Sequence, residues 1–60
     1  MNDKQIINQL MNRMFNDHMK IRQWYYGHNT HFGMSPEEMV KAGRSDEVIS
    51  YLVWAIEGPF

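Results

Sequence analysis

The feature that most constrains this chain is the absence of cysteine from only 60 residues. A domain of this size buries only about 60% of the surface that its unfolded chain exposes, so its stability is marginal. Small domains usually add a disulfide, a bound metal or a partner chain. Without cysteine, neither a disulfide nor a thiolate metal site is available. The sequence therefore predicts one domain, residues 1–60, that depends on close helix packing or on association with another chain.

Charge and hydrophobicity exclude several classes of protein. The formal net charge is −1, whereas a free-standing nucleic-acid-binding domain is normally basic. No run of residues approaches the ~18 apolar residues of a membrane span, and the N-terminal residues lack the apolar segment of a signal peptide. We therefore expect a cytoplasmic protein that has neither a nucleic acid nor a membrane as its partner.

Methionine and aromatic residues are abundant: the chain has six Met, two Trp, three Tyr and three Phe. Methionine is flexible and polarizable, which suits adaptable contact surfaces, and aromatic side chains contribute strongly to interface energies. Two interpretations follow, one in which these residues fill a small core and one in which they form a binding surface.

Residues 3–26 have the hydrophobic pattern of one long helix. At 100° per residue, one face collects Ile6, Ile7, Leu10, Met11, Met14, Ile21 and Tyr25. This stripe covers about half the circumference, more than the ~100° that a surface helix needs. We therefore expect the helix to self-associate or to pack on a partner helix, in a homo-oligomer. The contacts predicted for self-association are Met11, Phe15, His18 and Trp24.

A short second helix is marked by its first residues. Residues 27–34 contain two glycines and an asparagine and are predicted to form a loop. Ser35 is a predicted N-cap, Pro36 occupies the first helical position, and Glu38 completes a capping box. Gly43 is expected to end this helix after one to two turns.

A third helix is predicted to begin after Ser45 as its N-cap, with Asp46 and Glu47 placed favourably for the helix dipole. It is expected to run to Glu57 and to end at Gly58. Its apolar face comprises Val48, Ile49, Leu52, Ala55 and Ile56. The sequence thus predicts a small all-α domain with one long helix (1–26), a loop (27–34) and a pair of shorter helices (35–60).

Trp54 is predicted to lie on the polar side of the third helix, near Ser50 and Glu57. A tryptophan in that position is either covered by another part of the chain or offered to a partner. Tryptophan is enriched at binding hot spots. We therefore predict that Trp54, together with Tyr51, belongs to a partner-binding surface.

Residues 24–60 contain a set of residues whose order and spacing resemble the toxin-binding domain of the Xre/MbcA/ParS antitoxins. The set is Trp24-Tyr25, Asn29, Gly33-Met34-Ser35-Pro36-Glu37-Glu38-Met39-Val40, Gly43, Val48, Leu52 and Ile56-Glu57-Gly58-Pro59-Phe60. Members of that family commonly carry an N-terminal helix-turn-helix segment, but here only one predicted helix precedes the resemblance. DNA binding is therefore not carried over.

The resemblance implies a bacterial or phage protein whose partner is a toxin that consumes NAD. It also implies that the domain obstructs the entrance to the toxin's active site, with Glu57, Gly58 and Phe60 at the contact. The alternative for Phe60 is a frayed terminal residue.

The remaining patterns give little support for chemistry. His28 and His31 are close in sequence and His18 is predicted to be partly buried on the first helix, but no cysteine or nearby carboxylate completes a zinc site. The helices around Gly43 could be taken for a helix-turn-helix, yet the second begins with acidic residues that repel phosphate. We predict no catalytic residues, no cofactor and no metal.

The sequence therefore predicts a non-enzymatic, antitoxin-like protein-binding module that neutralises a partner enzyme or toxin by covering its active site. One alternative is a small phage-encoded inhibitor of a host defence or regulatory complex. A further alternative is a structural subunit of a helical assembly.

Overall fold

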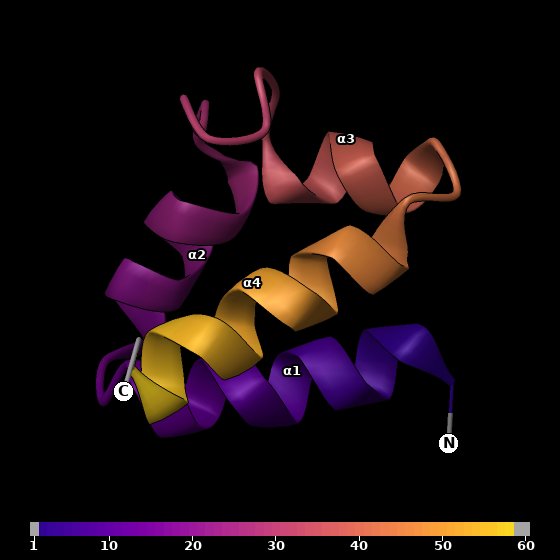
Figure 1. The fold of residues 1–60 in the computed structure, drawn as a ribbon. Coiled ribbons are helices and arrows are strands. Elements are labelled where there is room, and N and C mark those ends of the chain that lie inside the picture. The colour runs from indigo at the N-terminus through magenta and orange to yellow at the C-terminus, as the bar shows by residue number, and fades with distance from the viewer. Residues whose placement is uncertain (1, 59–60) are drawn as a thin grey trace.

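The computed structural model describes residues 2–58, which form an all-α fold, as predicted (Figure 1). Its helices are α1 (Asp3–Met14), α2 (His18–Tyr26), α3 (Pro36–Lys41) and α4 (Ser45–Glu57). None of the helices within residues 2–58 has the length and apolar character that a membrane crossing requires.

The prediction of one long helix over residues 3–26 is wrong, because the helix is interrupted between the end of α1 and the start of α2. Phe15 adopts an extended conformation with φ −120° and ψ 143°, and Asp17 begins α2 as its N-cap. The Asp17 carboxylate accepts a hydrogen bond from the Met19 N–H at 2.9 Å, an arrangement that favours a new helix start. A straight helix of this length would be roughly 36 Å long, whereas the largest extent of the molecule is 26 Å.

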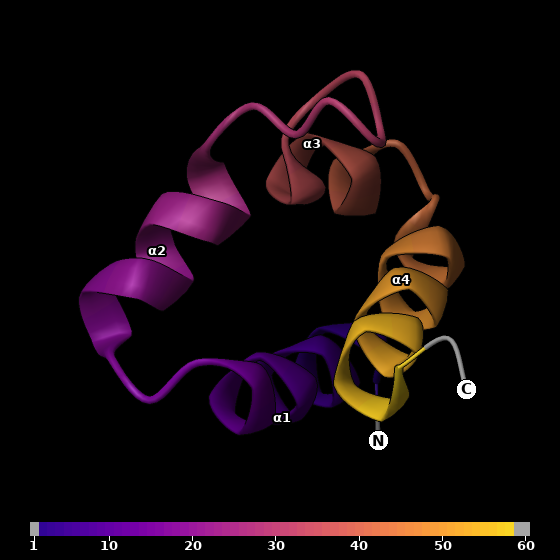
Figure 2. The same cartoon turned by 60° about the vertical axis from the view of Figure 1, so that its left-hand side comes forward.

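The break gives each half of the apolar stripe its own packing partner within the chain. The first helix, α1, packs along α4, whereas α2 packs against α3. Figures 1 and 2 show α4 beside α1 in both views, with α2 turned away from the α1 axis. The apolar stripe of residues 3–26 is therefore covered within the chain, in part by α4 and in part by α3.

All four helices contribute to one hydrophobic core. The buried side chains are Ile7, Met11, Ile21, Met39, Val48 and Leu52. Val48 and Leu52 come from the predicted inner face of α4 and are completely buried. Burial of an aliphatic side chain of this size contributes roughly 1.5–3 kcal/mol, so a few such residues largely determine the stability of the fold.

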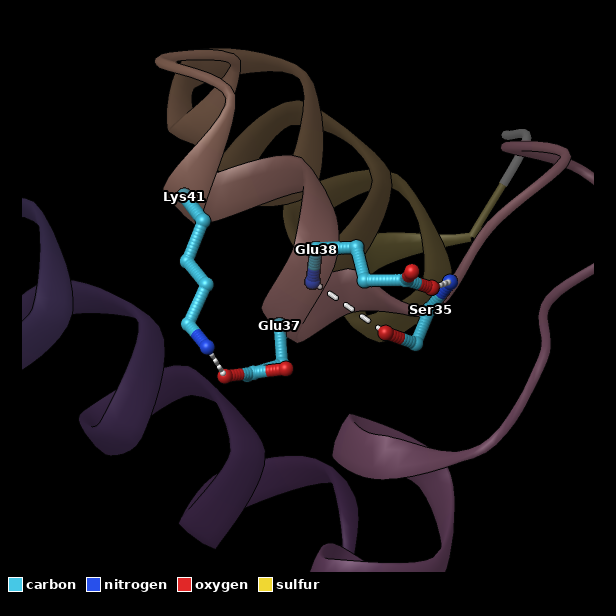
Figure 3. A network of polar contacts seen from close by, with 4 residues as sticks. All are labelled: Ser35, Glu37, Glu38 and Lys41. Carbon is cyan, nitrogen blue, oxygen red and sulfur yellow. Dashed lines mark hydrogen bonds and ion pairs between the residues drawn. The ribbon is translucent and has the colours of Figure 1, made fainter.

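The predicted capping box at the start of α3 is present (Figure 3). The Glu38 N–H donates to Ser35 Oγ at 3.1 Å, and the Ser35 N–H donates to Glu38 Oε1 at 3.0 Å. Pro36 occupies the first turn and is buried. After the helix, Gly43 has φ 77°, a left-handed conformation that other residues rarely adopt, and the chain reverses into α4.

The start of α4 differs from the prediction. Ser45 is not the N-cap but the first helical residue, and Arg44 occupies the cap position without a side-chain capping bond. The Ser45 hydroxyl instead donates to the Asp3 carboxylate of α1. This contact joins the first turns of α1 and α4, while Gly58 ends α4 as predicted.

Candidate protein-binding surface

Tyr51 of α4 is the centre of a cluster of aromatic rings. Its ring stacks on Trp24 of α2, with centroids 6.1 Å apart and planes 19° apart. The other rings near Tyr51 are His31 at 4.9 Å, Phe32 at 5.3 Å and Trp54 at 6.1 Å between centroids. Phe15 extends the cluster by contacting Trp24 at 6.1 Å. Residues from α2, the loop and α4 thus form one continuous aromatic unit.

The aromatic cluster runs from the core to the molecular surface. Trp24 and Phe32 are partly buried and pack against the hydrophobic core, whereas Trp54, on the outer side, is 55% exposed. Because the Trp54 indole contacts Tyr51, and Tyr51 stacks on Trp24, the exposed ring is supported by the folded body. A supported ring loses little conformational freedom when a partner binds.

An open hollow of about 450 Å³ lies beside Trp54 on the outer face of α4. We call this hollow the aromatic groove, and its lining residues are His31, Asp46, Glu47, Ser50, Tyr51 and Trp54. Five of the six belong to α4 at spacings of three and four residues, which places them on one helix face. The groove therefore combines aromatic rings with two carboxylates.

The loop between α2 and α3 places His31 against the groove. Asn29 organises this loop: its side-chain oxygen accepts from the His31 N–H at 2.8 Å. Its backbone carbonyl accepts from the N–H groups of Phe32 and Gly33 at 3.2 and 2.8 Å. The Asn29 N–H donates to the Met34 carbonyl at 3.2 Å. These bonds fix the turn that presents the His31 and Phe32 rings to Tyr51.

The carboxylates of the aromatic groove differ in their contacts. Glu47 receives two hydrogen bonds from the Arg44 guanidinium, from Nε at 2.7 Å and from Nη2 at 3.0 Å. This pairing lowers the pKa of the Glu47 carboxyl and raises the pKa of Arg44. Asp46, the adjacent residue, receives neither of these bonds. The acidic end of the groove thus has one paired carboxylate and one that Arg44 does not engage directly.

A second hollow, of about 420 Å³, lies between α1, α2 and α3, and we call it the central groove. Its floor includes core side chains such as Ile7 and Met11, which are 1% and 5% exposed. Lys4, Arg22 and Lys41 lie around it. In contrast to the aromatic groove, this hollow is basic and is continuous with the core.

Tyr25 and the α3 ion pair form one side of the central groove. The Lys41 ammonium lies 2.8 Å from Glu37 Oε2 (Figure 3), and this pairing raises the pKa of Lys41. Burial raises the pKa of the Tyr25 phenol, with smaller contributions from Tyr26 and Glu37. Tyr25 is therefore a neutral side chain of this groove at physiological pH.

The structure brings together two of the five residues predicted for partner binding. Trp54 and Tyr51 lie side by side in the aromatic groove. Glu57 is exposed at the last turn of α4 and Gly58 is the C-cap, but neither lines the groove. Phe60 lies outside the described residues.

The four residues predicted for self-association fall into two pairs: Met11 and His18 both line the central groove, whereas Phe15 and Trp24 pack together in the aromatic cluster. Met11 is 5% exposed and belongs to the core. His18, expected to be partly buried, is exposed in the first turn of α2. Phe15 and Trp24 are half-buried against one another in the aromatic cluster. Self-association itself stays a prediction.

The described residues do not bring the histidines together with other metal ligands. His31 packs on Tyr51, while His28 is an exposed loop residue. Within residues 2–58, no three side chains of histidine, aspartate or glutamate converge as a metal ion would need.

Sequence reasoning missed His31, Asp46 and Glu47 as residues of the aromatic groove. The signal for the acidic residues was present, because Asp46, Ser50 and Trp54 follow one another at four-residue spacing and so share a helix face. No comparable signal identified His31, because its position depends on the turn that Asn29 organises.

Comparisons of the chain with models of known protein families, with curated proteins and with solved structures found no match.

Proposed function

We propose that this chain is a non-enzymatic protein-binding module and that the aromatic groove is its binding surface. The observation that carries the proposal is the exposed Trp54 ring, supported through Tyr51 and Trp24 on the folded body. Tryptophan and tyrosine are enriched among the residues that form binding hot spots. The hollow is also open to solvent, whereas sites for small molecules are usually clefts that enclose most of the ligand.

The proposed action is neutralisation of a toxin-like enzyme by covering its active site, as in the antitoxins that residues 24–60 resemble. This action rests on the resemblance alone, because the Ser35 cap and the Gly58 C-cap within that region are features of helices in general. In this role the chain contributes contact area and shape, while the partner carries the chemistry.

The experiment compares binding by three forms of the full chain in cells of the source organism. Tagged wild-type chain, Trp54→Ala and Met19→Ala are used for affinity capture, followed by mass spectrometry. Met19 is 62% exposed and lines neither groove, so Met19→Ala is a matched control for the loss of an exposed hydrophobic side chain. We expect wild-type chain and Met19→Ala to recover the same protein, and Trp54→Ala to lose it.

The recovered protein is then purified and its affinity measured by titration calorimetry. A hot-spot tryptophan contributes about 2 kcal/mol or more, which corresponds to at least a roughly 30-fold loss of affinity for Trp54→Ala. Equal affinities for wild-type chain and Trp54→Ala would contradict the proposed surface. If the partner is an enzyme whose activity is unchanged in the complex, the neutralising role is wrong although the binding role stands.

The identity of the partner distinguishes the alternatives. An NAD-consuming toxin supports the antitoxin-like role, whereas a host defence or regulatory complex supports a phage-encoded inhibitor on the same scaffold. Sedimentation of the purified chain tests the third alternative, because a clean monomer at all accessible concentrations excludes a structural subunit built on self-association.

A further inference from the structure

The aromatic groove has two chemically different ends along α4. Asp46, Ser50 and Trp54 follow at four-residue steps, each of which advances roughly 6 Å along the helix axis. Helical side chains lean towards the N-terminus, so the Trp54 and Tyr51 rings incline towards the carboxylates. A ligand lying along the groove therefore contacts aromatic rings at the Trp54 end and carboxylates at the Asp46 end.

We infer that the aromatic groove binds an arginine side chain presented by the partner protein, an inference that rests on the proposed function. The guanidinium plane and the adjoining methylene groups lie against the rings of Trp54 and Tyr51. The guanidinium N–H groups donate to the Asp46 carboxylate and, when Arg44 is displaced, to Glu47.

The chemistry of the lining favours a cation over other side chains. Aromatic faces attract cations through the negative potential above the ring, and the Asp46 carboxylate adds to that attraction, whereas the charge of Glu47 is already paired with Arg44. No Lys or Arg is among the described residues that line this groove. The central groove has Lys4, Arg22 and the Glu37–Lys41 ion pair around it, which leaves it with a net positive charge. A basic segment of the partner is therefore attracted to one face of the molecule and repelled by the other.

The Arg44–Glu47 contact favours arginine over lysine. Arg44 already donates two hydrogen bonds to Glu47 from the edge of its planar group, which shows that this carboxylate accepts a guanidinium through both of its oxygens. A guanidinium also stacks on aromatic rings, whereas an ammonium is a more strongly hydrated point charge. Arg44 thus acts as an internal competitor for the same carboxylate.

The test uses the full chain and short capped peptides, monitored by the two tryptophan indole N–H signals in proton–nitrogen NMR spectra. Acetyl-Gly-Arg-Gly-amide is the probe, and the same peptide with citrulline in place of arginine is the control, because citrulline has a similar shape without the charge. We expect saturable shifts of the Trp54 signal with the arginine peptide, and at least about tenfold weaker binding of the citrulline peptide.

Two variants assign the effect to the carboxylates. Asp46→Asn combined with Glu47→Gln removes both charges from exposed positions and should weaken the arginine peptide about tenfold, a loss that reflects charge-assisted hydrogen bonds. Arg44→Gln removes the competitor and should tighten binding a few-fold. An unchanged amide spectrum outside α4 shows that each variant remains folded.

The inference is overturned if the citrulline and arginine peptides bind equally, or if the double variant binds the arginine peptide as well as the wild-type chain does. It is also overturned if the Trp54 signal shows no saturable shift up to about 20 mM peptide. If the arginine peptide does not bind but Trp54→Ala still loses the natural partner, the proposed function stands and only the inferred arginine contact is wrong. If the peptide binds but Trp54→Ala keeps the partner, the proposed function is wrong.

Discussion

The two grooves are similar in volume but differ in what supports them. The aromatic groove lies on the outer face of α4, where Trp54 and Ser50 are exposed. The central groove has core residues such as Ile7 and Met11 in its floor. A substitution in the aromatic groove can therefore change binding with little effect on folding, whereas a substitution in the floor of the central groove changes folding first.

The largest difference in the free energy of unfolding is expected between Met11→Ala and Trp54→Ala. Truncating a buried methionine creates a cavity and costs about 2–5 kcal/mol. A 60-residue domain has a total stability of roughly 3–9 kcal/mol at typical per-residue values, so Met11→Ala should remove a large part of that stability and lower the urea midpoint strongly. Trp54→Ala should keep the far-UV circular dichroism spectrum and shift the urea midpoint only slightly.

The two grooves would not be separable in this way if Trp54→Ala lowered the free energy of unfolding as much as Met11→Ala. In that case the Trp54 ring would belong to the cooperative fold, and the loss of a partner by that variant would report unfolding. Met19→Ala again supplies the reference for an exposed side chain.

A smaller effect is expected from two serines, one beside each groove. Ser35 caps α3, which forms a wall of the central groove, and it is 4% exposed. Ser35→Ala should lower the free energy of unfolding by about 1 kcal/mol. Ser50→Ala in the aromatic groove removes an exposed hydroxyl and should fall within about 0.5 kcal/mol of the wild-type chain. Urea unfolding followed by circular dichroism measures both, and equal losses would count against the capping interpretation.

The smallest expected effect is a loss of stability at acid pH. Hydrogen bonds from Ser35 lower the pKa of Glu38 in the folded chain, and the Arg44 pairing lowers that of Glu47. A lowered folded-state pKa stabilises the fold above the ordinary carboxyl pKa, and this contribution is lost as the pH falls through the folded value. Stability should therefore decrease below about pH 4.5.

Two glutamine variants divide this acid sensitivity between the α3 cap and the aromatic groove. Glu38→Gln keeps an oxygen for the cap but does not titrate, so its urea midpoint should change less between neutral and acid pH. Glu47→Gln should change the acid sensitivity less than Glu38→Gln does, because an exposed ion pair contributes little and is screened by salt. An unaltered pH profile for Glu38→Gln would show that other carboxyl groups dominate.

The sequence was most informative where a local pattern determines the structure. The Ser35-Pro36-Glu37-Glu38 pattern predicted the start of α3 because a capping box depends only on neighbouring residues. The helix break was missed because the hydrophobic period continues across it. Asn16-Asp17 was a usable signal, since both residue types favour caps over helix interiors, and the break keeps the largest extent of the molecule at 26 Å.

The candidate site was also predictable only where it depends on spacing within one helix. The position of Trp54 on the polar side of its helix followed from spacing alone, and the structure confirms its exposure. The contacts of Ser45 with Asp3 and of His31 with Tyr51 join residues that are distant in sequence. Such contacts depend on the tertiary arrangement, which the periodicity of a single segment does not specify.

The hydrogen bond between Ser45 and Asp3 joins residues that are 42 positions apart, and it has a consequence for synthesis. Because α1 finds its main packing surface on α4, α1 lacks that surface until α4 has left the ribosome. Short isolated helices are marginal in water, so α1 stays largely unstructured during translation. The domain should therefore fold in a single late step, and a ribosome stalled before Ser45 would hold a chain that proteases can still cut.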